Sequence, residues 1–262
     1  MDRRTLLKYS LSGIGVGLLG ASLQSIVNAE EPGSSQWGYI GGEGPEYWSE
    51  LSPDFQVCVS GEYQSPIDLN ASIPAELGEI EISYQDSPLK LINNGHTIQV
   101  NYEPGSYLKL DGQDYELLQF HFHKPSEHLV EGSPYDMEVH LVHRNQETGN
   151  LAVLGVFMKR GGSDNPTLSP IWDKMPKSAG PERSVRGVSV DASELLPEDK
   201  GGFYRYYGSL TTPPCSEIVN WIVFKQPIEV SAAQIVKFIN AAGINARPAM
   251  PINRRFVLSA GG

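Results

Sequence analysis

The chain has 262 residues, of which 40% are hydrophobic and 19% are charged, with 27 glycines and 19 prolines. This length and composition suit one loop-rich globular domain with a full core, and no repeat, low-complexity tract or long linker argues for a second domain. The formal net charge is -11. A surface this acidic repels phosphate backbones, so we expect no nucleic-acid partner.

The first 29 residues have the features of an export signal. The pair Arg3 and Arg4 precedes an uncharged, glycine-diluted stretch that ends in the small-residue pattern Val27-Asn28-Ala29, as in a twin-arginine signal with a cleavage site. We therefore expect residues 1–29 to be removed and residues 30–262 to form one periplasmic or otherwise extracytoplasmic domain, without stable membrane insertion. The alternative is an uncleaved membrane anchor. The stretch nearly reaches spanning length, but its glycines and serines make it too weakly apolar to suit a lipid bilayer.

From about residue 80 onward, short β-rich runs alternate with turn signals such as Asn93-Asn94-Gly95 and Asp111-Gly112, a pattern typical of antiparallel connections. The residues alone therefore predict a mostly antiparallel sheet with short peripheral helices. The predicted helices are Ala232–Ala242 and the weaker Pro166–Lys174 and Ala192–Leu195. The predicted strands are Glu79–Tyr84, Lys90–Ile92, Thr97–Tyr102, Leu108–Leu110, Glu116–His123, Met137–Arg144, Leu151–Lys159, Gly202–Gly208 and Glu217–Lys225.

The two cysteines, Cys58 and Cys215, lie far apart and form no CxxC pattern. In an exported protein the simplest expectation is one disulfide that closes a long loop. Two buried thiols are the alternative. Nothing around Cys58 would activate a catalytic thiol.

Candidate metal ligands are concentrated on two predicted strands that carry histidines. His121 and His123 share one face of the first strand because successive strand side chains point to opposite faces. His140 lies on the second strand. If the two strands are neighbours, three imidazoles converge and leave a fourth position open, as in a catalytic zinc site.

Two acceptors accompany these histidines. Gln119 and Glu138 each stand two residues before a histidine, on its face, and are placed to hold the second ring N–H of a ligand. The alternative is that the three imidazoles are ordinary sheet histidines satisfied by neighbours. That alternative describes His128 and His143 better, since His143 faces opposite to His140.

Besides the two histidine strands, the chain carries an ordered series of short motifs: Trp37-Gly38-Tyr39, Gly44-Pro45-Glu46-Tyr47-Trp48, Gln64-Ser65-Pro66-Ile67-Asp68-Leu69, Asn94-Gly95-His96, Ser126-Glu127-His128, Leu151-Ala152-Val153-Leu154-Gly155, Gly208-Ser209-Leu210-Thr211-Thr212-Pro213-Pro214 and Asn245-Ala246-Arg247-Pro248. Together these motifs give the chain a resemblance to the α-class carbonic anhydrases, of the exported bacterial type, over nearly all of residues 37–257. The resemblance implies a mainly β (α+β) single domain with a large, twisted, mostly antiparallel central sheet, and zinc at the bottom of a conical cleft.

The resemblance implies zinc-dependent, reversible hydration of carbon dioxide to bicarbonate and a proton, through a zinc-bound hydroxide. His121, His123 and His140 match the zinc ligands, with Gln119, Glu138 and Asn245 as their supports. Thr211 matches the residue that accepts a hydrogen bond from the hydroxide, and Glu127 matches the carboxylate behind it. Because a carboxylate only accepts, Glu127 would make Thr211 donate to it.

His96 matches the family's proton shuttle, a role that suits an imidazole titrating near neutral pH. Asn94 and Gln99 match the polar side of the cleft, and Thr212 matches a residue beside the metal. The apolar wall for carbon dioxide corresponds to Val142, Val153, Leu210 and Trp221. Cys58 and Cys215 match a disulfide of exported members. The shortened connection at Lys124-Pro125 departs from the longer form of the class.

Two rival functions remain for such a sequence. A non-catalytic carbonic-anhydrase-like binding protein usually lacks a ligand, whereas all three are present here. A three-histidine iron or copper oxygenase of cupin type accommodates the histidines but has no place for the Leu210–Pro214 loop. The sequence leaves the oligomeric state open and is compatible with a homodimer.

Overall fold

The computed structural model of the chain describes residues 36–78 and 80–261. The expected export signal over residues 1–29 lies outside this part of the chain. Within it, no helix has both the length and the apolar character needed to cross a membrane.

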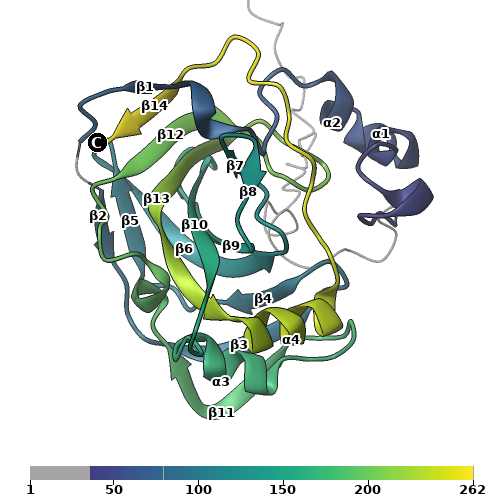
Figure 1. The fold of residues 1–262 in the computed structure, drawn as a ribbon, viewed down its shortest axis with the longest axis vertical. Coiled ribbons are helices and arrows are strands. Elements are labelled where there is room, and N and C mark those ends of the chain that lie inside the picture. The colour runs from purple at the N-terminus through teal and green to yellow at the C-terminus, as the bar shows by residue number, and fades with distance from the viewer. Residues whose placement is uncertain (1–35, 79, 262) are drawn as a thin grey trace, which may run out of the picture.

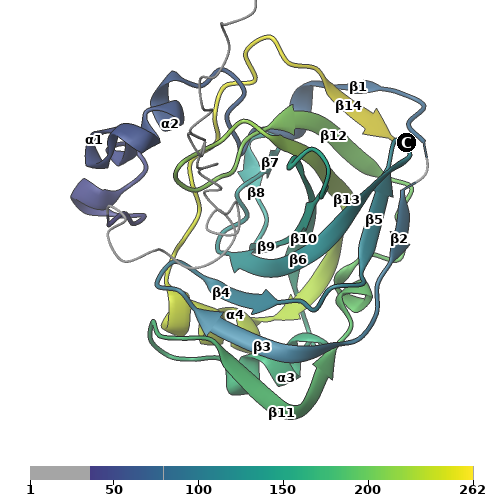
Figure 2. The same ribbon diagram turned by 180° about the vertical axis from the view of Figure 1, so that it is seen from behind.

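One large twisted sheet of twelve strands curves around the middle of the molecule (Figures 1 and 2). Its strands are β1 (Ser72–Pro74), β2 (Glu81–Ser83), β3 (Ser87–Asn93), β4 (Ile98–Asn101), β5 (Tyr107–Leu110), β6 (Gln113–His123), β9 (Met137–Arg144), β10 (Leu151–Gly161), β11 (Arg183–Val190), β12 (Phe203–Gly208), β13 (Val219–Ser231) and β14 (Val257–Ala260). A separate hairpin joins β7 (Leu129–Val130) to β8 (Ser133–Pro134).

The main path of the sheet runs β1-β14-β12-β13-β10-β9-β6-β4-β3-β11, while β5 pairs with β6 and β2 pairs with β5. The pairings of β1 with β14 and of β10 with β13 are parallel. The central pairings of β9 with β10 and with β6, and of β6 with β4, are antiparallel. The expected mainly β domain with a mostly antiparallel sheet is confirmed.

Short helices lie at the periphery. The longest of the described helices, α4 (Ala232–Ala242), has the predicted bounds and starts with a capping box of Ser231 and Gln234, which satisfies free N–H groups of its first turn. The other α-helices are α1 (Trp48–Leu51), α2 (Val57–Ser60) and α3 (Leu168–Lys174), and the 3-10 helices are η2 (Gly41–Glu43), η3 (Pro53–Phe55), η4 (Leu69–Ala71) and η5 (Ala192–Leu195).

The sequence missed the edges of the sheet. Strand β11 is mostly exposed, so it lacks the apolar alternation that marks a half-buried strand. Strand β13 continues through Pro227 to Ser231, past the predicted end at Lys225. Its pairing with β10 shifts register between Val156 and Met158, and such an irregularity accommodates a proline in a sheet.

The central strands are buried on both faces. Phe120 and Phe122 of β6 and Leu141 of β9 belong to the main core, which α3 and α4 cover. The alternate side chains of β6 and β9 point to the other face, which we call the ligand face after His121, His123 and His140. A second apolar cluster, which contains Val142, lies on this face.

A disulfide joins Cys58 in α2 to Cys215, 157 residues later. The expected bridge is confirmed, and the alternative of two buried thiols is wrong. It fixes the N-terminal helices to the loop that follows β12, and it indicates an oxidising compartment.

His143 faces the main core, opposite to His140, and is fully buried. Its Nδ1–H donates to the main-chain oxygen of Ala152 at 3.1 Å, and its Nε2 accepts from the Tyr84 hydroxyl at 2.6 Å. Burial lowers the pKa of His143 to about 4, against main-chain hydrogen bonds that raise it. The neutral ring is therefore the native form.

This burial predicts a loss of stability in acid. Because the pKa of His143 is about 4 in the folded chain and 6.5 ordinarily, the unfolded chain binds the proton more readily. The stabilisation is complete above pH 6.5, and the free energy of unfolding should fall by about 3 kcal/mol between pH 6.5 and 4. Denaturant unfolding of wild type and His143→Gln across this range measures the effect. Parallel stability curves for the two proteins would contradict the assignment.

Candidate metal centre

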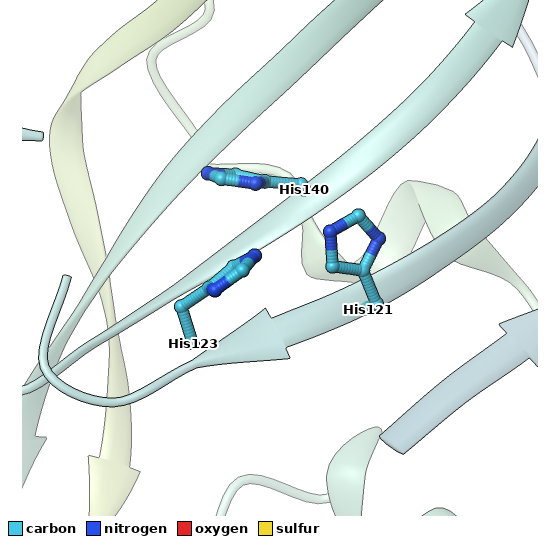
Figure 3. A group of neighbouring side chains, drawn as sticks. All are labelled: His121, His123 and His140. Atoms are coloured by element: carbon cyan, nitrogen blue, oxygen red, sulfur yellow. The ribbon is translucent and has the colours of Figure 1, made fainter. Parts of the chain in front are cut away.

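Three imidazoles converge on the ligand face (Figure 3). His121 and His123 come from β6, and His140 comes from the neighbouring β9, where it pairs directly with His121. The ring centroids lie 4.6 to 5.4 Å apart. One nitrogen from each ring lies within 4.8 Å of the other two. The antiparallel register of two strands with matched parity brings this trio together.

Side-chain acceptors hold two of the rings. Nδ1 of His121 lies 2.9 Å from Oε1 of Gln119, and Nε2 of His140 lies 2.9 Å from Oε1 of Glu138. Both oxygens can only accept, so these nitrogens carry the protons. The lone pairs of His121 Nε2 and His140 Nδ1 are left for a metal.

Asn245 holds the third ring through its main chain. Its carbonyl oxygen accepts from Nδ1 of His123 at 2.8 Å. Its side-chain amide donates to the main-chain oxygens of His96 and Phe122, and its Oδ1 accepts from the N–H of Lys124. Asn245 is thus placed for the support role expected of it, because it contacts both the His123 ring and the turn that carries His96.

The donor set fits a zinc ion. Nε2 of His123 is buried and, among the described residues, has no hydrogen-bond partner, which is costly unless a ligand fills the gap. Desolvation lowers the pKa of His121, His123 and His140, so the imidazoles are neutral at neutral pH, as metal binding requires. His121 retains partial exposure, which leaves the centre reachable from solvent.

Glu138 links the rings to the surrounding structure. Its Oε1 accepts from the rings of His140 and His128, and its Oε2 accepts from the main-chain N–H groups of Glu127 and His128. Burial raises the pKa of Glu138, but the nearby His128 and His140 hold it well below its usual range. The far nitrogen of His128 lies 2.7 Å from the Tyr206 hydroxyl.

Glu127 lies behind the imidazoles, fully buried. Its Oε1 accepts the main-chain N–H of Arg247 at 2.9 Å, and among the described residues its Oε2 has no hydrogen bond of standard length. Burial raises the pKa of Glu127 to about 7, while His140, the Arg247 N–H and the Thr211 hydroxyl lower it. A divalent cation beside these rings would lower it further.

His96 lies on the turn before β4, half-buried. Its ring stacks on Trp37, with centroids 3.6 Å apart and an angle of 5° between the planes. Asn94, expected on the polar side of a cleft, uses its side-chain oxygen to accept the N–H groups of His96 and Thr97. Gln99 lies on β4 opposite His121, on the ligand face.

The four apolar residues expected to contact carbon dioxide come together. Val142, Val153 and Trp221 pair in register across three adjacent strands, and Leu210 packs against their cluster. The Trp221 ring lies 4.8 Å from that of His140. Thr212 is half-buried in the loop that also bears Thr211, and its carbonyl accepts from the N–H of Cys215.

Sequence reasoning missed three contacts of this site. His128 was assigned to ordinary neighbours, yet it shares a carboxylate with His140. Trp37 was read only as part of a motif, and its stacking on His96 needs a chain reversal that no local pattern encodes. Arg247 donates its main-chain N–H to Glu127. Such a contact cannot be predicted from the type of side chain, because any non-proline residue has this donor.

Comparison with known proteins agrees with this geometry. The family model described as eukaryotic-type carbonic anhydrase matches residues 43–260. A carbonic anhydrase of Nostoc sp. (strain PCC 7120) is 49% identical over 98% of this chain and 97% of its own. Dioscorin DB3L of Dioscorea polystachya is 37% identical over 92% of each chain.

A solved structure gives the same result for the fold. The α-carbonic anhydrase of Thermovibrio ammonificans, in complex with the inhibitor sulfanilamide, superposes with a TM-score of 0.82 at 46% identity. The match covers 86% of this chain and 100% of that one. The chain therefore belongs to the α-class carbonic anhydrases, enzymes that hydrate carbon dioxide.

Proposed function

We propose that the chain binds one zinc ion through His121, His123 and His140 and catalyses the reversible hydration of carbon dioxide to bicarbonate and a proton. One observation carries the proposal. Each imidazole has one nitrogen held by a fixed acceptor and the other directed at a shared point, where the buried Nε2 of His123 has no partner among the described residues.

Zinc suits this donor set better than metals that prefer oxygen ligands, because three imidazoles with an open position are typical of its catalytic sites. In carbonic anhydrases, which are the source of this value, zinc lowers the pKa of a bound water to about 7 and supplies hydroxide at neutral pH. The chain's own contribution is to hold the rings neutral and in one tautomer.

Thr211 and Glu127 are proposed to orient the nucleophile. The carboxylate of Glu127 can only accept, so the Thr211 hydroxyl donates to it. The Thr211 oxygen is then left to accept a hydrogen bond from the nucleophile, which would turn a lone pair of the nucleophile toward the carbon. Support comes from the proximity of the Thr211 hydroxyl, which lowers the pKa of Glu127.

The apolar residues Val142, Val153, Leu210 and Trp221 are proposed to receive carbon dioxide. The molecule has no charge and no hydrogen to donate, so a wall that excludes water suits it. Thr212 would lie beside the metal, and Asn94 would line the polar side of the cleft. The wall adjoins His140, whose ring contacts Trp221.

His96 is proposed to carry the proton of each turnover to buffer in solution. An imidazole can both accept and release a proton, as a carrier between a buried site and solution must. The half-buried ring, stacked on Trp37, has the partial exposure that exchange with buffer requires.

Export is proposed from the paired arginines and small-residue pattern at the start of the chain. The disulfide supports it, because such bridges persist in oxidising compartments. The mature, periplasmic or otherwise extracytoplasmic protein would begin near Glu30, and N-terminal sequencing of exported material would locate that start.

A non-catalytic binding protein is the second candidate, since dioscorin, a structural neighbour at 33% identity, was solved in complex with ascorbate. The complete set of imidazoles, each with its acceptor, favours the enzyme. A carbon dioxide hydration assay separates the two.

His121→Ala should abolish both zinc binding and hydration. Two ligands hold zinc poorly, and the missing ring also takes away the partner of Gln119. Metal analysis and stopped-flow hydration measure the two losses. His143→Gln is the matched control, because it alters a buried histidine of the neighbouring strand and should retain stoichiometric zinc. A wild-type protein that binds zinc but leaves hydration at its spontaneous rate would overturn the proposed function.

Glu127→Gln should lower kcat/KM for carbon dioxide by about 100-fold, the cost typical of one misdirected hydrogen bond at a catalytic centre. The amide can donate to Thr211 and so reverse the direction of that bond. Zinc content should stay unchanged. If Glu127 acts through the hydroxyl, Glu127→Gln combined with Thr211→Ala should be no slower than Thr211→Ala alone; additive losses would exclude that route.

His96→Ala should slow kcat in weak buffer by about 100-fold, the low end for loss of a positioned proton carrier. The variant should keep kcat/KM, because proton export follows the chemical step. Concentrated imidazole buffer should restore kcat. Buffer-independent turnover equal to wild type would show that the proton leaves by another path.

A further inference from the structure

Two amides in series end on a surface carboxylate beside the candidate metal centre. Nε2 of Gln99 donates to Oδ1 of Asn101 at 2.6 Å, and Nδ2 of Asn101 donates to Oε2 of Glu182 at 2.5 Å. Gln99 is buried, Asn101 is half-buried and Glu182 is exposed. The three residues therefore connect the ligand face to the protein surface.

The inner end of this series adjoins the metal ligands. On β4, Gln99 pairs in register with His121, and Asn101 pairs with Gln119, the residue that holds the His121 ring. His96 stands three residues before Gln99, on the turn that leads into the same strand. Gln99 thus lies on the segment that links the proposed proton carrier to the strand of the metal ligands.

The outer end is held in place from both sides. Arg183, the next residue after Glu182, pairs with Leu91 at the start of β11. Gly180 donates its N–H to the main-chain oxygen of Asn93, beside the His96 turn. Glu182 is therefore anchored to the sheet although its side chain is exposed.

A carboxylate at the end of the series fixes the direction of every bond in it. Glu182 can only accept, so Asn101 must turn its NH2 group outward and its oxygen inward. Gln99 must then donate to that oxygen, which leaves its own Oε1 without a donor among the described residues. This Oε1 is not among their fully buried unsatisfied atoms, so it retains some access to solvent although Gln99 is buried.

We propose that Glu182 is a positioning residue, which makes the group that Gln99 presents beside His121 a carbonyl oxygen and not an NH2 group. The inference rests on the proposed function, in which a proton leaves the metal centre for His96. An acceptor at this place accepts a hydrogen bond from a water molecule and leaves both lone pairs of that water free to receive the departing proton. An NH2 group would occupy one of the two lone pairs.

Glu182→Gln tests the assignment at an exposed position where folding is not at risk. Its amide can either donate or accept, so the direction of the series is no longer fixed. We expect kcat in saturating buffer to fall by about 3- to 10-fold, the effect of one neutral hydrogen bond on a barrier. Values of kcat/KM and zinc content should stay at wild type.

A second substitution should restore the rate. Asn101→Asp in the Glu182→Gln background places an acceptor-only group next to Gln99, which must again donate to it and present Oε1. Glu103→Gln is the matched control: Glu103 is a neighbouring surface carboxylate that pairs with Lys90 and has no bond to the series. In a Gln99→Leu background, Glu182→Gln should have no further effect.

Equal losses from Glu103→Gln and Glu182→Gln, or no rescue by Asn101→Asp, would overturn the proposal in favour of a general surface charge effect. A readout independent of activity is neutron diffraction of the deuterated, zinc-free protein. The deuterated amide nitrogen of Gln99 should point at Asn101 in the wild type. In Glu182→Gln, the Gln99 amide should show a mixture of both orientations. If the deuterated amide nitrogen of Gln99 points away from Asn101 in the wild type, the assignment is refuted. Absent hydration with the expected amide direction would instead count against the proposed function alone.

Discussion

The site depends on imidazole rings whose protonated nitrogens are held by buried acceptors. Gln119, Glu138 and the carbonyl of Asn245 each accept from one ring. Because an amide or carboxylate oxygen here can only accept, each bond fixes both the orientation of a ring and its tautomer. Two of the acceptors lie on the strands that carry the histidines, two residues away, so the sheet that positions the rings also positions their partners.

Glu138 is an acceptor whose charge is fully buried. Burial of an ionised carboxylate is unfavourable, and here four donors offset it: two ring nitrogens and two main-chain N–H groups. The main-chain donors belong to Glu127 and His128, so the carboxylate that holds a proposed ligand also shapes the loop that bears Glu127. His128 extends the network to Tyr206. Loss of one member would leave several buried polar groups unsatisfied, which ties the metal centre to the stability of the fold.

Local periodicity was enough to predict the centre of the molecule. Alternation in β6 and β9 places Phe120 and Phe122 in the core and the histidines opposite, and the structure has that arrangement. What periodicity cannot encode is contact between distant segments through main-chain atoms, as for Asn245, or stacking such as that of Trp37 on His96. Strand β11 escaped prediction because an exposed edge has no apolar alternation. The residue roles came from resemblance, since Thr211 and Glu127 alone resemble a turn threonine and a surface acid.

One physical device recurs at three distances from the metal centre. Glu138 fixes a ring tautomer, Glu127 is proposed to direct a hydroxyl, and Glu182 is proposed to direct two amides. Hydroxyls and amides can each be reversed at little cost, so a network built from them alone has no preferred direction. An ionised carboxylate removes that freedom because it has no proton to give. Proton transfer needs a direction, and these carboxylates are proposed to supply it without taking part in the chemistry.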